Sequence, residues 1–416
     1  MYRIHAYKNC IHRINIMTSE ERHKKRYIRR KVRRDAKAKE MAEKYSDFDD
    51  IFGFHALLDA YKNCKKGVMW KSSTQAYKAN LLTNTADTAR RLKEGTWKSR
   101  GFHEFDIIER GKPRHIKSVH ISERVIQRSL CDNCLMPILR RSMIYDNGAS
   151  LEGKGTDFAL ERIICHIQKY YRKYGRTGGI YLFDFSNYFG NIQNYPLTQK
   201  VRKKIFEEKV LKYYEKFIFA FGEKGLGLGS QVSQISAIYY PNNIDHFIKD
   251  QLSVKFYGRY MDDGYIIHHD LKELRRIADA FEKKCEESGI ILNKKKCRII
   301  KLHKQFKFLK IRFFVTKSGK VVKRISREAV TKERNRLRKF KGFLTEGKMT
   351  LDEICKSLHA WLRSQKRGKS YHIKRNMIRY FNDLYREEGV QFVPNNYRGR
   401  KKRVFRDCVI YQEARE

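Results

Sequence analysis

Two adjacent carboxylates, Asp262 and Asp263, stand inside an apolar stretch, YGRYMDDGYIIHHD at 257–270. A carboxylate that leaves water must pair with a cation or coordinate a metal, because its desolvation is otherwise very unfavourable. The β-branched and aromatic residues on both sides predict two strands joined by a tight turn, with Gly258 and Gly264 interrupting the pattern. The sequence therefore predicts a β-hairpin with two acids at its tip, and an exposed Asp-Gly turn is the alternative.

A third acid, Asp184, follows the apolar run IYLF and precedes Phe185. Alone, it is equally typical of a helix N-cap after a strand. Together with Asp262 and Asp263 it supplies the carboxylates that a two-metal phosphoryl-transfer site needs to hold two Mg²⁺ ions about 3.5–4 Å apart. One ion would activate a 3′-hydroxyl and the other would neutralise a triphosphate, with Mn²⁺ as a substitute metal.

The composition favours a polyanionic partner. The chain has 92 Lys and Arg against 46 Asp and Glu, a net charge of +46, yet 41% of its residues are hydrophobic, as in a folded protein. Nucleic acid is the partner that most commonly neutralises such a field, and a membrane surface is the second candidate. No apolar run approaches the roughly 20 residues of a bilayer span, and no apolar leader follows the first charges, so we expect a cytoplasmic protein.

Periodicity predicts an α+β order with a mostly antiparallel sheet. A capped basic helix starts near Thr18, two helical patterns at 48–67 and 73–95 each end in glycine, and a hairpin occupies 102–121. The remaining predicted helices are 122–139 with Ser122 as its cap, 157–174, the segment from the glycine-rich patch at 222–234 to about 251, 271–288, and a basic helical region at 326–388 broken at Gly347 and Gly368. The remaining predicted strands are 180–183, 290–293, 296–300 and 306–315.

Nine cysteines occur, and only Cys131 and Cys134 form a CxxC pair. A single such pair without neighbouring histidines is weak support for zinc, so we expect a structural role on a partly buried helix.

The order of the motifs resembles that of reverse transcriptases. YMDD at 260–263 is similar to the YxDD catalytic hairpin of that family, and DFSNYFGNI at 184–192 is similar to its first catalytic motif. Three further segments resemble the fingers motif, a lysine motif near the phosphates and the primer-gripping hairpin: KPRHIKSVHISERVIQ at 112–127, NKKKCRI at 293–299 and FLKIRF at 308–313. The resemblance covers roughly residues 48–385.

The resemblance implies roles for individual residues. Asp184, Asp262 and Asp263 would be the catalytic acids and would bind metal with the carbonyl of Phe185. Phe189 would be the aromatic gate that excludes a ribose 2′-hydroxyl, with Tyr188 as its rival and core packing as the alternative for either ring. The implied nucleotide-binding residues are Lys112, Arg114, Phe185, Phe189, Gly229, Gln234 and Lys296.

The glycine-rich motif departs from part of the family. GLG at 227–229 stands where group II intron and retron enzymes usually have Pro-Gln-Gly, and Ser233-Gln234 follows. This resembles the bacterial and phage enzymes of diversity-generating retroelements and of defence-associated, uncharacterised groups. Lys310 stands where the family often has glycine, which would add a cation near the primer.

The implied fold is a right-hand polymerase with fingers, a palm of antiparallel sheet plus helices, and an all-helical thumb. Its expected parts are a basic N-terminal helical extension at 1–47, fingers at 48–180 with the start of the palm near the end, palm at 181–318, thumb at 319–388 and a basic tail at 389–416. Cations expected to contact nucleic acid are Lys24, Lys25, Arg26, Arg29, Arg30, Arg33, Arg34, Lys310, Arg400, Lys401, Lys402 and Arg403. The alternative for the first group is a solvated charged helix.

The expected function is an RNA-directed DNA polymerase that copies a dedicated noncoding RNA in a bacterial antiviral-defence or retroelement system. Its expected partners are a structured template RNA, a DNA or RNA primer and dNTPs, with an accessory protein or a second copy of the chain as a further alternative. Diversification, a maturase-like RNA-binding role, and untemplated or protein-primed synthesis stay open. The sequence also leaves Met1 and Met17 as alternative starts.

Overall fold

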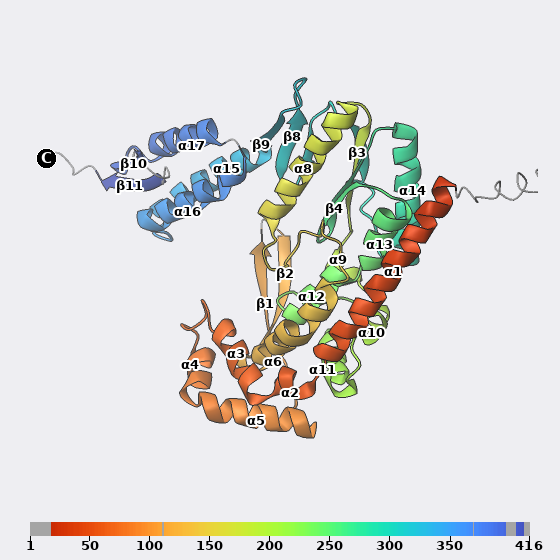
Figure 1. The fold of residues 1–416 in the computed structure, drawn as a ribbon. Coiled ribbons are helices and arrows are strands. Elements are labelled where there is room, and N and C mark those ends of the chain that lie inside the picture. Colours follow the sequence, from red (N-terminus) through yellow and green to blue (C-terminus); the bar gives the residue numbers. More distant parts are fainter. Residues whose placement is uncertain (1–17, 110–111, 369, 397–404, 412–416) are drawn as a thin grey trace, which may run out of the picture. The chain divides into compact units, whose positions relative to one another are not determined.

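The computed structural model describes residues 18–109, 112–368, 370–396 and 405–411 (Figure 1). They form two compact units, which are described in turn. The first contains residues up to 155 together with 184–262 and 276–294, and the second contains 156–183, 263–275 and the chain from 295 onward. Within the described ranges, no helix is both long and apolar enough to cross a bilayer.

The first unit begins with the basic helix α1 (Ser19–Lys44). Its start confirms the predicted cap, because the Thr18 side chain accepts from the Glu21 backbone N–H while the Glu21 carboxylate accepts from that of Thr18. One face of the helix packs: Arg34 forms an ion pair with Asp250, and the described side chains Ala38 and Ala42 are buried. The remaining face carries the exposed cations.

Each of the next two predicted helices is interrupted. The first divides into α2 (Phe48–Phe52) and α3 (Phe54–Cys64) at Gly53, where a Cβ would lie 2.3 Å from the Asp49 carbonyl oxygen. The second divides into α4 (Ser72–Ala79) and α5 (Leu81–Glu94). Gly95 ends α5 in the left-handed region, as the sequence predicted.

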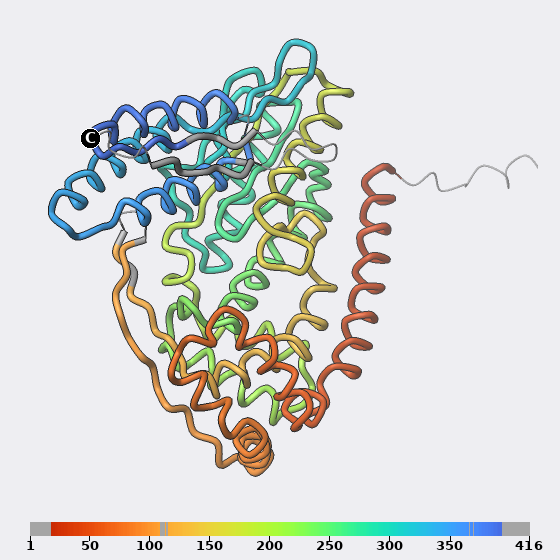
Figure 2. The backbone as a smooth tube through the Cα atoms, turned by 90° about the vertical axis from the view of Figure 1, so that its left-hand side faces the viewer, coloured from red at the N-terminus to blue at the C-terminus, as the bar shows by residue number. Residues whose placement is uncertain are grey.

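The predicted hairpin is present as β1 (Phe102–Glu109) and β2 (Lys112–Val119), antiparallel from Phe102 opposite Val119 to Glu109 opposite Lys112 (Figure 2). Helix α6 (Ile121–Leu130) follows, but its cap is His120 and not Ser122. The His120 Nδ1 accepts from the Ser122 backbone N–H at 3.3 Å.

A π-helical turn, η1 (Cys131–Leu135), joins α6 to α7 (Met136–Arg140). Cys131 and Cys134 are both buried there, and burial raises the pKa of the Cys134 thiol to about 12. Neutral buried thiols agree with the structural role that the sequence favours for this pair.

Short helices and one strand complete the first unit. They are α9 (Tyr188–Asn191), α10 (Asn194–Arg202), α11 (Glu208–Phe219), α12 (Gln231–Tyr239), α13 (Asn242–His246), the π-helical turn η2 (Phe247–Gln251), β4 (Phe256–Tyr260) and the larger part of α14 (Leu271–Glu287). The predicted helix that ends near 251 is broken at Pro241, which caps α13.

The second unit contains α8 (Thr156–Tyr174) and the neighbouring strands β5 (Asp263–His268), β3 (Gly179–Asp184) and β6 (Arg298–Lys301), in that order. β3 is buried along its length and runs antiparallel to β6. Gly264 lies inside β5 and does not interrupt it. A Cβ there would lie 2.1 Å from the Phe183 ring, so close packing explains this glycine.

A second sheet has the order β7 (Phe306–Phe308), β8 (Ile311–Val315) and β9 (Val321–Ile325). The predicted strand at 306–315 is therefore two strands. Leu309 and Lys310 form the two-residue turn between them, with φ values of +45° and +67°. The predicted strand at 290–293 is wrong, since it contributes only an isolated bridge from Leu292 to Phe185.

The predicted basic helical region is confirmed as α15 (Arg327–Thr345), α16 (Leu351–Ser364), the short η3 (Gln365–Arg367) and α17 (Tyr371–Leu384). Leu337, Leu358 and Phe381 lie in its core, and the Tyr385 hydroxyl donates to the Leu337 carbonyl at 2.9 Å.

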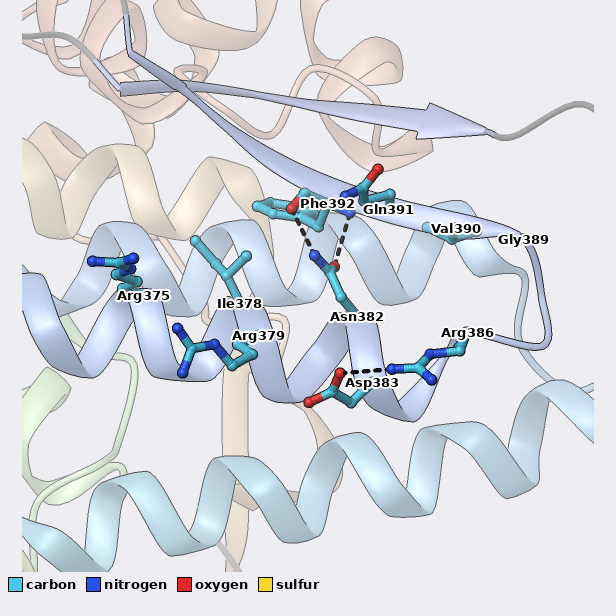
Figure 3. A pocket seen from close by; sticks show the side chains of 10 residues that line it. All are labelled: Arg375, Ile378, Arg379, Asn382, Asp383, Arg386, Gly389, Val390, Gln391 and Phe392. Carbon is cyan, nitrogen blue, oxygen red and sulfur yellow. Dashed lines mark hydrogen bonds and ion pairs between the residues drawn. The ribbon is translucent and has the colours of Figure 1, made fainter.

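Where the sequence predicted only a basic tail, the backbone forms the antiparallel strands β10 (Val390–Asn396) and β11 (Phe405–Tyr411). Asn382 on α17 fixes β10: its amide nitrogen donates to the Phe392 carbonyl at 3.1 Å, and its oxygen accepts from the Phe392 N–H at 2.9 Å (Figure 3). The predicted cations Arg400, Lys401, Lys402 and Arg403 lie outside the described residues.

The contact between Arg34 and Asp250 predicts how α1 is held. Burial opposes ionisation of Asp250, but hydrogen bonds from His246 and Arg34 outweigh it and hold the pKa of that carboxyl at about 2. Arg34→Ala should weaken the docking of α1 by roughly 1.5–3 kcal/mol, the typical value of a charged hydrogen bond. Hydrogen exchange of residues 19–44 should accelerate accordingly.

Arg33→Ala is the matched control, because Arg33 is exposed on the same helix. It should leave the exchange rates of residues 19–44 unchanged. Equal protection in the two variants would contradict the role given to Arg34.

Candidate active site

The first unit brings two of the three predicted acids together. Asp184 ends β3 and its side chain is buried, whereas Asp262 lies half-buried in the turn after β4. The Phe185 backbone N–H donates to the Asp262 carbonyl at 3.0 Å, so the two segments run side by side. Asp263 follows directly and is the first residue of β5.

Asn293 holds Asp184 at two points. Its backbone N–H donates to the Asp184 carbonyl at 2.8 Å, and its side-chain amide donates to the Asp184 Oδ1 at 3.2 Å. The sequence reasoning missed this residue, although it begins the NKKKCRI segment from which Lys296 was chosen. An amide that donates to a carboxylate oxygen fixes the orientation of the carboxylate.

A buried arginine supports the turn that carries Asp262. Arg259 donates from Nη1 to the Met261 carbonyl at 2.9 Å, and Met261 adopts a φ of +54°. A non-glycine residue in that region is strained and persists only where its surroundings hold it. The hydrogen bond from Arg259 is such a constraint.

Arg259 is itself fixed by a fork of two bonds to Asp245, from Nε to Oδ1 at 2.9 Å and from Nη2 to Oδ2 at 2.6 Å. The Tyr257 hydroxyl donates to Asp245 at 2.5 Å, and Arg259 Nη2 also donates to the Ile238 carbonyl at 3.0 Å. Burial alone would lower the pKa of Arg259, but the paired carboxylate outweighs it and raises that pKa.

The donors at this site suit a divalent metal ion. Two carboxylates and a neighbouring backbone carbonyl are hard oxygen ligands of the kind that Mg²⁺ and Mn²⁺ prefer. The described residues hold no ready-made cluster of three or more His, Cys, Asp or Glu side chains. Mg²⁺ commonly uses one or two carboxylates and completes its shell with water and substrate phosphates, so Asp184 and Asp262 are compatible with it.

A cavity of about 490 Å³ in the first unit gathers three predicted nucleotide-binding residues, Phe189, Gly229 and Gln234. Its lining also includes Arg124 and Gln127 on α6, and Arg128, which the sequence reasoning did not select. The signal for the two arginines was their spacing of four residues, which places Arg124 and Arg128 on the partly exposed face of α6, whereas Gln127 is buried.

The structure separates the two rival aromatic residues. The Tyr188 ring is buried, and its hydroxyl donates to the Ala237 carbonyl at 2.6 Å. Phe189 lies partly exposed in the lining of the cavity. Tyr188 is therefore a core residue, and Phe189 is the one placed to meet a ligand.

The glycine-rich segment forms another part of the lining. The Leu226 N–H donates to the Phe189 carbonyl at 2.9 Å, which ties the segment to the predicted gate. Gly229 has a φ of +102°, and Ser230 caps α12 while its hydroxyl donates to Gln127 Oε1 at 3.2 Å. The Gln234 amide donates to the Ser150 hydroxyl at 2.7 Å.

The other predicted site residues are placed as follows. Lys112 and Arg114 belong to β2 by their backbone, but their side chains lie outside what the structure describes. Lys296 and Lys310 are exposed residues of turns in the second unit. On α1, the exposed cations are Lys24, Lys25, Arg26, Arg29, Arg30 and Arg33, whereas Arg34 is half-buried at Asp250.

Comparison with known proteins gives one family. Residues 98–313, more than half of the chain, match the reverse transcriptase (RNA-dependent DNA polymerase) family. The chain belongs to this family, and its mixed helices and antiparallel sheets are those of a right-hand polymerase fold. No curated protein sequence matches it.

The solved structures that match this chain include two telomerases. Telomerase from Candida albicans in complex with a TWJ fragment of telomeric RNA gives a TM-score of 0.44 at 12% identity over 70% of this chain and 62% of that one. Apo telomerase from Candida tropicalis gives 0.42 at 13% identity over 53% and 48%. The chain thus spans about half to three fifths of the telomerase chains it matches.

The separation of Tyr188 from Phe189 predicts two different mutant phenotypes. Phe189→Ala should raise the ratio of ribonucleotide to deoxyribonucleotide incorporation on the order of tenfold or more, because it removes the ring that lines the cavity. Single-nucleotide extension with matched dNTP and rNTP would measure this ratio.

Tyr188→Phe is the matched control. It should lower the free energy of unfolding by about 1 kcal/mol through loss of the bond to Ala237, while leaving the ratio unchanged. A shift in the ratio with Tyr188→Phe, and none with Phe189→Ala, would reverse the assignment.

The pair Arg259–Asp245 predicts a strong stability effect. Asp245→Asn leaves the buried guanidinium without its counter-charge and should reduce the free energy of unfolding by about 3–5 kcal/mol, measured by urea denaturation. Arg259→Lys, which keeps the charge but loses the fork, should fall between wild type and Asp245→Asn. Asp279→Asn, at an exposed position, should have no effect, and a similar stability of all variants would contradict the role of the pair.

Proposed function

We propose that this reverse transcriptase adds dNTPs to a 3′-hydroxyl by a two-metal mechanism and copies a dedicated, structured noncoding RNA. The proposal assigns metal binding to Asp184, Asp262, Asp263 and the carbonyl of Phe185, with Mg²⁺ as the physiological ion. Bound there, the metal ions would supply activation of the attacking hydroxyl and neutralisation of the triphosphate.

The observation that carries the proposal is the hydrogen bond from the Phe185 N–H to the Asp262 carbonyl. It sets the end of the DFSNYF motif beside the YMDD turn inside the segment matched by the family. Asn293 contributes by holding the Asp184 carboxylate in one orientation. Chain geometry, and not motif order alone, thus supports the joint action of the two acids.

The cavity lined by Phe189, Gly229 and Gln234 supports a nucleotide-binding role. A ring at its wall suits discrimination against a 2′-hydroxyl, and the cations Arg124 and Arg128 suit phosphate or template contacts. Leu228, in the same lining, takes the place of the family's glutamine, which supports the assignment to the diversity-generating or defence-associated groups.

The exposed cations of α1 support binding of a structured RNA. Six of the predicted cations lie on its exposed surface, while Arg34 anchors the helix. Charges fixed on a rigid helix suit A-form RNA, which is recognised by shape and phosphate positions. A noncoding RNA of a bacterial antiviral-defence or retroelement system is the template class that we favour.

The test uses the protein purified with the RNA that accompanies it. Mg²⁺ and labelled dNTPs are added, and RNA and product are sequenced. DNA complementary to one bound RNA is expected, with loss of at least a thousandfold in Asp262→Asn because a metal ligand is removed. The exposed Asp279→Asn is the matched control and should retain full activity.

Three other outcomes identify the alternatives. DNA without a complementary RNA would replace templated copying by untemplated synthesis, and DNA covalently attached to the protein would show protein priming. Tight RNA binding without any DNA product in wild type would favour the maturase-like role. A template repeat copied with errors into a variable repeat would favour diversification over defence.

A further inference from the structure

A second cavity in the first unit has the chemistry of a site for unpaired nucleic acid. It measures about 860 Å³ and is bounded by the segment 68–74, the start of the β1–β2 hairpin and the start of α6. The lining includes three cations, Lys71, Arg100 and Arg124. His103 and His120 add polar rings, and the described residues of the lining include no carboxylate.

Trp70 is the feature that distinguishes this cavity from a merely basic hollow. Its side chain is 75% exposed, although indole is the side chain that gains most from burial. The ring is nevertheless held: its Nε1–H donates to the Gly67 carbonyl at 3.2 Å, and the Lys71 ammonium lies 5.4 Å from the ring centroid. A fixed, exposed aromatic face beside cations is the arrangement on which unpaired bases stack.

Arg124 connects this cavity with the candidate nucleotide site. It lines both cavities, together with Trp70 in one and with Phe189 and Gly229 in the other. Its guanidinium donates to the Ser118 hydroxyl at 3.2 Å, and its carbonyl accepts from the Cys64 thiol at 3.5 Å. Ser118 lines the Trp70 cavity and Cys64 lines the other, so Arg124 is anchored on both sides.

We propose that the cavity at Trp70 binds an unpaired nucleotide of the template strand, with its base stacked on the Trp70 ring and its phosphates at Lys71, Arg100 and Arg124. The strand would then pass Arg124 toward the cavity at Phe189. This deepens the proposed function, on which it rests, by giving the single-stranded template a defined path. An acidic peptide would use the cations but has no base to stack.

Binding is measured without dNTPs, so that the result does not depend on catalysis. A primer–template duplex with a template overhang of one nucleotide is compared with one whose overhang is about ten, within the span of known single-strand sites. The long overhang should bind on the order of tenfold more tightly, and Trp70→Ala should abolish this difference. Trp70→Phe should retain most of it, and the short overhang should bind all variants equally.

Tryptophan fluorescence gives a second readout, since the chain has three tryptophans and Trp97 is buried. The long overhang should quench the tryptophan fluorescence of the wild-type protein. This quenching should disappear in Trp70→Phe but persist in Trp361→Phe. Leu82→Ala, at another exposed apolar residue outside the cavity, should bind like wild type.

The proposal would be overturned if Trp70→Ala weakened the binding of both duplexes equally, or if it changed the binding of neither. Equal quenching by heparin, which has no bases, would overturn stacking and leave an anion site. Loss of polymerisation with intact overhang binding would refute the proposed function alone, because this assay requires no chemistry.

Discussion

The buried ion pair between Arg259 and Asp245 belongs to a set of bonds that connects α12, α13, β4 and the turn after β4 in the first unit. Both side chains are fully buried, so neither charge has water as an alternative partner. The arginine backbone also bonds to the segment 146–148, where its N–H donates to Asp146 and its carbonyl accepts from Gly148. Any packing that displaced one partner would leave a charge unpaired, and this selects one arrangement of α12, α13, β4 and the following turn.

This constraint explains how a strained turn persists beside a buried acid. The Met261 carbonyl accepts a hydrogen bond from the same guanidinium that binds Asp245. The position of α13, which carries Asp245, therefore constrains the conformation of the turn. Asp184 is held by another residue, Asn293. The two acids are thus positioned by two separate sets of contacts, which limits the freedom of each before any ligand binds.

Local rules recovered much of this fold from the sequence. The cap at Thr18, the stop at Gly95, the hairpin at 102–119 and the three basic helices after 326 depend on neighbours along the chain, and all are present. The sequence predicted a continuous helix through Gly53 and an interruption of the strand pattern at Gly264, and both predictions were wrong. Close packing explains each glycine, against the Asp49 carbonyl at Gly53 and against the Phe183 ring at Gly264. Residue propensities carry no information about such distances between atoms.

The residues of the candidate site likewise divide into those that the sequence indicated and those that it did not. Motif order was sufficient to select Asp184, Asp262, Phe189, Gly229 and Gln234, and the structure places the last three in one cavity. Asn293 and Arg259 were missed because their partners are distant in sequence. A count of cations likewise does not distinguish Arg34 and Arg259, which neutralise buried or half-buried acids, from those that face solvent.

The turn between β7 and β8 carries a lysine in a backbone conformation that glycine adopts without strain. Leu309 and Lys310 both have positive φ, which matches the twist of a two-residue hairpin but disfavours side chains with a Cβ by about 1 kcal/mol. A search for heat-resistant variants would therefore select glycine at position 310, and the exposed ammonium group of Lys310 would be lost. At this turn, the substitution that relieves the strained φ angle is also the one that removes a surface charge.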